Sequence, residues 1–282
     1  RAPGELQPAL SRLAGPFFDL RHSDFMRFCG FLSPWLALVA AACAAPQAPQ
    51  GVVRPLPASE VLSYRAEWRL IYAGSARLTW SPAEAGGRAG WAARLHLESA
   101  GLVSRLYRVN NDYSSLADSQ LCLISSLLRA SEGSRRRETS VVFDGARHKA
   151  SLTARDLVTN AISTQEIDIR PCEHDVIGAL YRLRAMGLEP GQSIEMPVSD
   201  GKRAVMVRVE AQERETIRTD AGAYQTIRYE AFLFNNVLYR RRGRLLFWLT
   251  DDSRRLPVQV RIRLPFYIGT VTLQLQKDRP RH

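Results

Sequence analysis

Apolar and polar residues alternate with a period of two over most of the chain after residue 60. In the first such stretch, Tyr64, Ala66 and Trp68 share one face, and charged residues stand between them. This alternation is typical of a β-strand that has one buried face. We expect one strand over 64–72, with a break or bulge at Gly74. The pattern returns at 76–80, 91–99, 141–144, 193–198, 205–209, 223–234, 244–249, 258–264 and 270–276. Turn residues such as Gly, Asp and Ser separate many of these stretches, which predicts an antiparallel meander.

One segment departs from the period of two. Residues 174–186 carry apolar residues at helical spacing, and Gly187 follows as a candidate C-cap. His174 or Asp175 can cap the first turn. A lone amphipathic helix needs an apolar surface, and the concave face of a curved sheet offers one. The sequence therefore predicts a mainly β fold: a curved antiparallel sheet or open barrel-like meander with one amphipathic helix packed in its concavity.

The N-terminal region has the outline of a secretory signal. Met26 and the positive Arg27 precede an apolar run over 31–42, and small residues follow. The run is short for a membrane span and Pro34 interrupts it, so export is favoured over a permanent transmembrane helix. The predicted divisions are an untranslated leader or disordered extension over 1–25, a signal peptide over 26–43, a flexible linker over 44–60 and a single β-rich domain over 61–278.

Cys43 is a candidate lipidation site. The run from Val39 to Cys43 resembles the lipobox of bacterial lipoproteins, but Ala40 stands where Leu is usual. Ordinary signal-peptidase cleavage at the small residues around Ala42 competes with this interpretation. If Cys43 is acylated, Ala44 resembles the sorting residue of outer-membrane lipoproteins. The expected location is therefore the bacterial periplasm or outer membrane, and a lipid anchor at Cys43 is the membrane association that we expect.

Two cysteines remain in the predicted folded region, Cys122 and Cys172. An even pair in an exported protein predicts a disulfide, and two independent buried thiols are the alternative. A bond between them closes a loop of about 50 residues, for which the chain-entropy model gives a stabilisation on the order of 4 kcal/mol.

The charge balance does not point to nucleic acid. The chain has 39 Lys and Arg against 28 Asp and Glu, a net charge of +11. The basic clusters at 135–137 and 240–244 fall where turns are expected, so they are most simply interpreted as solvent-exposed charge. The alternative is that they anchor anionic lipid head groups. We expect no nucleic-acid partner.

The sequence offers weak grounds for catalysis. His174 and Asp175 are better explained as a helix start, and Asp251 and Asp252 as a hairpin turn. Phosphate loops, calcium loops and metal-ligand spacings are missing from the sequence. We therefore predict no enzyme activity, no catalytic residue, no metal and no cofactor.

Five motifs in order resemble the DUF3108 family of exported bacterial proteins, over about 64–276. They are Tyr64-x-Ala66-x-Trp68 with Gly74, the run from Leu106 to Tyr113, Val142-Phe143-Asp144, the run from Asp175 to Arg184, and the run from Trp248 to Val258. The resemblance implies a β-rich exported domain of uncharacterised function. In outline it is similar to curved-sheet envelope carriers that shelter acyl chains, and it supplies no catalytic residue.

A curved sheet can leave an apolar cleft in its concavity, and such clefts are preferred ligand sites. The candidate cleft residues are Trp68, Tyr72, Trp80, Leu180 and Trp248. Packing in the core is the alternative for these side chains. We expect a non-enzymatic envelope protein that binds or shuttles a lipid or other apolar ligand. The alternative is an envelope scaffold with a filled core that recruits a protein partner.

Overall fold

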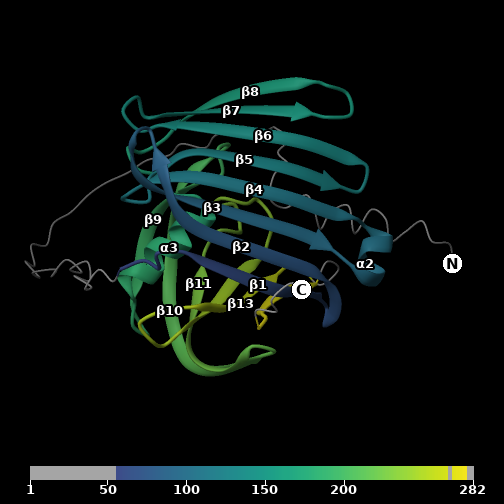
Figure 1. The fold of residues 1–282 in the computed structure, drawn as a ribbon, viewed down its shortest axis with the longest axis vertical. Helices are drawn as coiled ribbons and strands as arrows, with labels where there is room; N and C mark the ends of the chain where they lie inside the picture. The colour runs from purple at the N-terminus through teal and green to yellow at the C-terminus, as the bar shows by residue number, and fades with distance from the viewer. Residues whose placement is uncertain (1–54, 266–268, 278–282) are drawn as a thin grey trace, which may run out of the picture.

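The computed structural model describes residues 55–265 and 269–277, and its strands form one curved antiparallel sheet (Figure 1). Within these residues the strands are β1 (Glu60–Trp68), β2 (Ile71–Ala85), β3 (Arg88–Ser99), β4 (Val109–Asp118), β5 (Leu123–Glu132), β6 (Arg135–Asp144), β7 (Lys149–Asp156), β8 (Ile162–Asp168), β9 (Ser193–Ser199), β10 (Ala204–Thr219), β11 (Gly222–Ala231), β12 (Arg244–Thr250), β13 (Pro257–Arg263) and β14 (Thr270–Leu275). The predicted mainly β class is confirmed.

The sheet consists of two meanders joined through the first and last strands. The order across the 14 described strands is β8-β7-β6-β5-β4-β3-β2-β1-β14-β13-β12-β11-β10-β9. β1 pairs with β14 in register Tyr64 to Leu275, while β8 and β9 are the two ends of the order. The sheet is therefore bent but not closed. Figure 1 shows β1–β8 as a broad curved layer lying over β9–β13.

The predicted helix is α3, Val176–Met186, with the predicted caps at both ends. Asp175 accepts a hydrogen bond from the Gly178 N–H at 2.5 Å, and Gly187 adopts the left-handed conformation at φ 68°. An N-cap side chain replaces a missing backbone partner, and glycine at the C-cap avoids the penalty of a Cβ. Ile177 packs in one buried cluster and Leu183 in another, so α3 lies in the concavity of the sheet.

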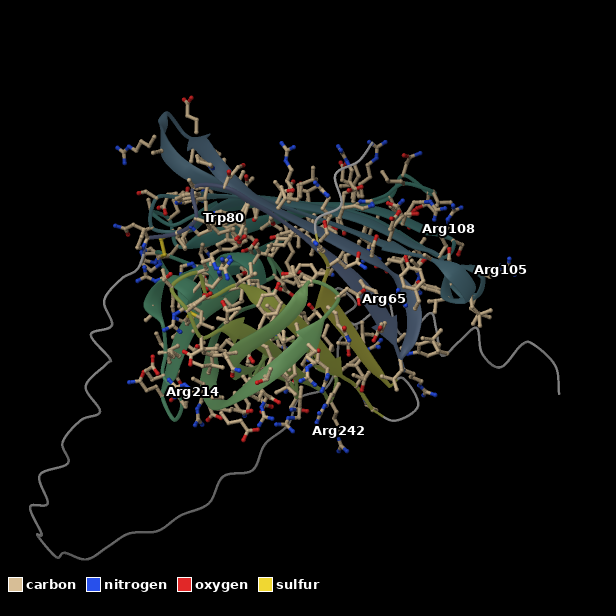
Figure 2. The ribbon with its side chains drawn as sticks, turned by 60° about the horizontal axis from the view of Figure 1, so that its bottom comes forward. Arg65, Trp80, Arg105, Arg108, Arg214 and Arg242 are labelled. Carbon is tan, nitrogen blue, oxygen red and sulfur yellow. A yellow bond between two sulfur atoms is a disulfide. The ribbon has the colours of Figure 1, made fainter. Side chains whose placement is uncertain are left out.

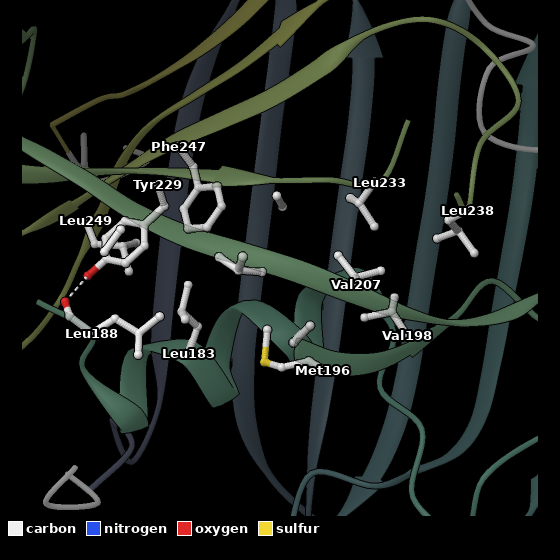
Figure 3. Close-up of a cluster of buried hydrophobic side chains, with 14 of the residues drawn as sticks. Leu183, Leu188, Met196, Val198, Val207, Tyr229, Leu233, Leu238, Phe247 and Leu249 are labelled. Atoms are coloured by element: carbon white, nitrogen blue, oxygen red, sulfur yellow. Dashed lines mark hydrogen bonds between the residues drawn. The ribbon is translucent and has the colours of Figure 1, made fainter. Parts of the chain in front are cut away.

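Two buried clusters meet on the two sides of α3. Toward β1–β3, the ring of Trp80 stacks on Tyr181 of α3 with 3.8 Å between centroids. Toward β10–β12, Leu183 faces Tyr229 and Phe247 (Figure 3). The Tyr229 hydroxyl donates to the Leu188 carbonyl at 2.9 Å, which holds the end of the helix to β11. The concavity next to α3 is therefore filled by side chains.

A disulfide fastens the start of α3 to the sheet. Cys122 lies in the turn between β4 and β5, and Cys172 lies shortly before the helix; their Cα atoms are 4.7 Å apart. The Leu123 N–H donates to the Glu173 carbonyl next to this bond, and the ring of His174 contacts the Leu121 carbonyl at 2.7 Å.

The structure differs from one local prediction and agrees with another. The stretch 64–72 is a hairpin rather than one strand, because Arg69 and Leu70 form a turn and Trp68 pairs with Ile71. The bulge expected at Gly74 is present, as a register shift that leaves Ala73 without a partner on β1.

The alternation also missed some elements. The strands β4, β5, β7 and β8 were not among the predicted stretches, and β8 is exposed along nearly its whole length. The short helix α2, Gly101–Leu106, was not predicted either. A six-residue helix is too short to show a helical period, and an exposed strand has no buried face to mark in the sequence.

Candidate functional site at the α2 end of the sheet

The structure separates the five predicted cleft residues. Trp80 is 2% exposed and stacks between Tyr181 and Trp91, so it belongs to the core. Leu180 is partly buried against the cluster on the β10–β12 side of α3. Trp68 and Tyr72 lie instead at the opposite end of β1 and β2. Within the described residues, the five side chains therefore do not line one common cleft.

Trp248 is 2% exposed and belongs to the buried cluster that contains Trp80 and Tyr181 of α3. Phe247 and Leu249 of β12 face the helix (Figure 3), and successive strand residues point to opposite faces. The indole N–H of Trp248 donates to Glu215 at 2.7 Å, and the guanidinium of Arg261 lies over its ring at 5.0 Å. Trp248 is therefore packed among other side chains, which is the alternative considered above for the candidate cleft residues.

Apolar side chains gather instead where α2 meets the β1–β2 hairpin. Leu70 is 90% exposed and Leu102 is 58% exposed. We call this group the α2-end surface. It consists of Leu70, Ile71, Tyr72, Leu102 and Leu106. Exposed single leucines are common, but a contiguous exposed apolar group is typical of a binding surface.

Backbone contacts hold α2 against β2. The Ala100 N–H donates to the Ala73 carbonyl at 2.8 Å. A Cβ built on Gly101, which has φ 60°, would lie 3.8 Å from the ring of Tyr72, so the helix starts directly on that ring. Leu102 and Leu106 are four residues apart and share one face of the helix. The two halves of the α2-end surface are therefore parts of one packed unit.

A polar contact fixes the far end of α2. The Gly133 N–H donates to the Arg108 carbonyl at 2.8 Å, and Asn111 Nδ2 donates to Glu132 Oε1 at 2.7 Å. Burial raises the pKa of the Glu132 carboxyl, and burial together with Glu132 raises the pKa of the Tyr107 hydroxyl. These contacts hold the segment that follows α2 against the turn between β5 and β6.

Arginines surround the α2-end surface. Arg105 lies in the last turn of α2 and Arg108 lies just after it, and both are exposed. The guanidinium of Arg65 lies 4.6 Å from the centroid of the Tyr72 ring, and that of Arg69 lies 5.4 Å from the Trp68 ring. Figure 2 shows Arg65, Arg105 and Arg108 on the same side of the molecule, away from Trp80 and Arg214. The exposed apolar group thus has a positively charged border.

The turn at the tip of this surface is strained. Arg69 and Leu70 have φ of 51° and 69°. A two-residue hairpin turn with both φ positive normally carries Asn-Gly, because other residues pay about 1–2 kcal/mol in the left-handed region. The strain keeps Leu70 in solvent at the extreme end of the hairpin. Strained backbone of this kind is concentrated at functional sites.

Replacing the turn with its preferred residues tests the strain. We expect Arg69→Asn/Leu70→Gly to raise the free energy of unfolding by about 1 kcal/mol, measured by urea denaturation, because Asn and Gly adopt the turn with less strain. The matched control is Leu157→Gly, an exposed turn leucine without a positive φ, which should not stabilise the protein. An unchanged or lower stability for the Asn-Gly variant would show that the turn is not strained.

The groups considered for acid/base chemistry have structural contacts. His174 is buried, which lowers the pKa of its imidazole, and its ring contacts the Leu121 carbonyl. Asp175 accepts from the Tyr113 hydroxyl at 2.5 Å as well as capping α3. Asp251 pairs with Arg214 at 2.7 Å, and Asp252 accepts from Thr250 in the β12–β13 turn.

The described residues contain neither a metal-binding cluster nor a membrane-spanning helix. Three or more His, Cys, Asp or Glu side chains do not gather there as a metal site. The described helices are too short or too polar to cross a membrane. The candidate lipidation site Cys43 and the predicted signal peptide lie outside the described residues.

Sequence reasoning missed most of this surface. Trp68 and Tyr72 were singled out, but Leu102, Arg105 and Leu106 were not. Their spacing, with two leucines four residues apart and an arginine between them, was the available signal. It could not be distinguished from core packing without the position of α2 at the edge of β2.

The fold is similar to that of a β-barrel-like protein whose crystal structure is known. A crystal structure of a β-barrel-like protein of the domain of unknown function DUF1849 from Brucella abortus is similar to this chain, with a TM-score of 0.51 and 9% identity over 80% of this chain and 98% of that one. A DUF1089 family protein from Pseudomonas aeruginosa matches at TM-score 0.30 and 13% identity, over 81% of this chain and 95% of its own. A protein from Bacteroides fragilis, described as exported and YmcC-like in fold, matches at TM-score 0.30 and 9% identity, over 80% and 98%.

No curated protein matches the chain. Residues 63–276 match the model of the DUF3108 family, which is described as a protein of unknown function. The match agrees with the order of the motifs in the sequence. This match covers more than half of the chain, so the chain belongs to the DUF3108 family.

Proposed function

We propose that this protein is a non-enzymatic, exported envelope protein that binds lipid at its α2-end surface. The observation that carries the proposal is the contiguous group of exposed apolar side chains on the β1–β2 hairpin and α2, bordered by arginines. Amphipathic surfaces that combine an apolar patch with Lys or Arg are typical of binding in the interfacial region of membranes. The lipid contact therefore lies on the outside of the protein.

The filled concavity supports an external site rather than an internal one. Trp80, Tyr181 and Leu183 occupy the space around α3 and are almost completely buried. Interiors packed in this way leave little room for an acyl chain. An apolar ligand at the α2 end would displace water from side chains that are already exposed, which is favourable without any opening of the core.

Two features support export. Residues 26–45 have the outline of a secretory signal. The disulfide between Cys122 and Cys172 belongs to a class of bond that persists in oxidising compartments and is rare in the cytosol. The periplasm or the outer membrane is the proposed location, and lipidation at Cys43 is part of the proposal for the outer-membrane form.

The proposal that the protein is not an enzyme is supported by the roles of its candidate catalytic groups. His174 and Asp175 hold the start of α3, and Asp251 and Asp252 hold the β12–β13 turn and its neighbours. Groups that are committed to structural hydrogen bonds are poorly placed to exchange protons with a substrate.

Co-flotation with lipid vesicles tests the proposal. The protein is purified without detergent and mixed with vesicles of phosphatidylcholine and phosphatidylglycerol. We expect the protein to float with the vesicles, and the triple variant Ile71→Ser/Leu102→Ser/Leu106→Ser to bind about a hundredfold more weakly. Each lost apolar side chain removes on the order of 1 kcal/mol of transfer free energy for partial burial in the bilayer.

The control removes exposed apolar residues elsewhere. Val142 on β6 is 59% exposed and Ile162 on β8 is 65% exposed, so Val142→Ser/Ile162→Ser loses similar surface away from α2. We expect this control to float like the wild type. Failure of the wild type to bind any vesicle, or equal weakening of both variants, would refute a lipid site at the α2 end.

A scaffold that recruits a protein partner is the second candidate, and the edge strand β8 favours it. Residues Ile162–Asp168 are exposed except for Ile167, and the strand has β7 as a neighbour on one side in the sheet order. An open strand edge can accept a strand from another chain. Native mass spectrometry of the same preparation separates the two candidates, because a retained lipid mass supports the first and a retained polypeptide supports the second.

A further inference from the structure

We infer that the α2-end surface docks on an anionic bilayer, with its apolar side chains in the acyl boundary and its arginines on lipid phosphates. This inference rests on the proposed function and names the kind of lipid surface that the site selects. It also goes beyond the expected association through a lipid anchor at Cys43, since here the folded domain itself contacts the membrane.

The arrangement of charge around the apolar group supports this partner. Arg105 lies on α2 between Leu102 and Leu106, and Arg108 follows the helix. On the hairpin side, Arg65 and Arg69 lie over aromatic rings. The apolar group is therefore flanked by guanidinium groups on both sides. Negatively charged lipid headgroups attract these guanidinium groups electrostatically, whereas a neutral lipid surface does not.

Three acidic side chains at this end of the sheet have partners of their own. Glu67 pairs with Arg65 at 3.3 Å. Glu98 accepts from Ser75 at 3.0 Å and lies 3.8 Å from His96, and Glu132 accepts from Asn111. The pair with Glu67 offsets charge on Arg65, so the positive charge of the border next to Leu102 and Leu106 comes from Arg105 and Arg108.

The geometry also suits the headgroup chemistry. Ala100, Gly101, Leu102, Ser104, Arg105 and Arg108 line an open pocket of about 630 Å³. A guanidinium donates two parallel hydrogen bonds to a phosphate, so Arg105 and Arg108 can hold a phosphate at the pocket while the neighbouring leucines face the acyl chains. The aromatic rings beneath Arg65 and Arg69 orient these side chains before contact, because cations lie favourably over ring faces.

Exposed apolar side chains also lie at the turn between β7 and β8. Val158 and Ile162 lie at the β7–β8 turn beside Asp156, whose carboxylate accepts from the Val158 and Thr159 N–H groups. The contacts with backbone donors lower the pKa of Asp156, so it stays charged near neutral pH. Arg137 and Arg155 lie next to this carboxylate, so the turn carries charge of both signs, whereas Arg105 and Arg108 border the apolar residues of α2.

The test compares two vesicle compositions and two arginine variants of the whole protein. We expect the wild type to bind vesicles that contain phosphatidylglycerol at least tenfold more tightly than vesicles of pure phosphatidylcholine. For Arg105→Gln/Arg108→Gln, binding to the anionic vesicles should weaken about thirtyfold and binding to the neutral vesicles should change little, since each arginine near an anionic surface contributes on the order of a fivefold gain. High salt should have the same effect as the variant.

The matched control is Arg242→Gln, an exposed arginine far from Arg105 and Arg108 in Figure 2. It removes one positive charge without touching the α2 end, and we expect binding within twofold of the wild type. A loss of about fivefold for Arg242→Gln, the value expected for any one arginine, would assign the attraction to net charge and overturn the inference.

The outcomes separate this inference from the proposed function. Equal binding of the wild type to both vesicle compositions leaves lipid binding intact and overturns the anionic preference. Absence of binding to both compositions overturns the proposed function itself. Circular dichroism of each variant establishes that it is folded, because Arg105 and Arg108 are exposed and their removal should not disturb the sheet.

Discussion

Replacing Trp80 with alanine is expected to lower the free energy of unfolding by about 3–5 kcal/mol, the usual range for removing a large buried aromatic side chain. Trp80 is 2% exposed, and its ring lies between Tyr181 of α3 and Trp91 of β3, at centroid distances of 3.8 and 5.1 Å. Its removal leaves a cavity between the sheet and the helix that neighbouring strands cannot fill. Urea denaturation followed by far-ultraviolet circular dichroism measures the change.

Trp68 provides the matched control, because it is the same residue type at the other end of β1 and β2 and is only partly buried. Trp68→Ala should lower the free energy of unfolding clearly less than Trp80→Ala does. Similar losses for the two variants would contradict the distinction between a core tryptophan at α3 and a tryptophan near the α2-end surface.

A loss of similar size is expected when the charge partner of a buried arginine is removed. The side chain of Arg184 on α3 is 3% exposed and forms an ion pair with Glu60 at the start of β1. Glu60 also accepts from the Tyr181 hydroxyl at 2.5 Å. Glu60→Ala leaves the guanidinium buried without its counter-ion, which typically costs 3–5 kcal/mol. Urea denaturation at neutral pH measures the effect.

Two variants make the interpretation of Glu60→Ala specific. Adding Arg184→Met to Glu60→Ala removes the unpaired charge and should recover most of the lost stability, because an apolar pair can replace a buried ion pair. The exposed pair Arg129–Glu138, at 2.7 Å, is the surface control, and Glu138→Ala should cost less than about 1 kcal/mol. A Glu60→Ala variant as stable as Glu138→Ala would contradict a buried pair at α3.

These two predictions concern the same structural element, the helix α3 that fills the concavity. α3 is held by its N-cap, by the disulfide that precedes it, by the Glu60–Arg184 pair and by the Tyr229 contact with Leu188. The variants at the α2 end change none of these contacts. Loss of lipid binding without loss of stability is therefore measurable, and it separates the surface site from the core.

Part of this structure follows from local sequence. Alternation along 91–99 and 258–264 predicts strands with one buried face, and a strand places neighbouring side chains on opposite sides whatever it pairs with. Asp175 and Gly187 mark the ends of α3 because capping depends on a few consecutive residues. The antiparallel β class, the helix and its caps could therefore be derived before any tertiary contact was known.

The sequence was less informative about which face of each strand meets the helix. Residues 245–249 read Leu-Leu-Phe-Trp-Leu, so both faces of β12 are apolar and the alternation does not say which one meets α3. The register between Tyr229 and Phe247 places Phe247 and Leu249 in the buried cluster with Leu183, and Trp248 belongs to the buried cluster with Trp80 and Tyr181. The alternation therefore does not show which buried cluster each residue of β12 joins.

The turn at Arg69 and Leu70 shows the other limit. These residues carry no Gly, Asn or Asp that would announce a hairpin, and a continuous strand over 64–72 fits the local pattern equally well. Pairing of β1 with both β2 and β14 imposes the turn, because the Arg69 N–H donates to the Thr270 carbonyl and Trp68 pairs with both Ile71 and Val271. Long-range pairing thus overrode a local preference.

Local patterns were therefore sufficient for the fold class, the position of α3 in the chain and membership of the family, since each depends on residues close together in sequence. Which apolar residues are covered and which stay in solvent was decided only by the tertiary structure. Trp80 and Leu102 are both apolar residues in regular elements, yet one is buried under α3 and the other is exposed on α2. Exposure depends on which distant elements lie above a residue, and no period in the chain encodes that directly.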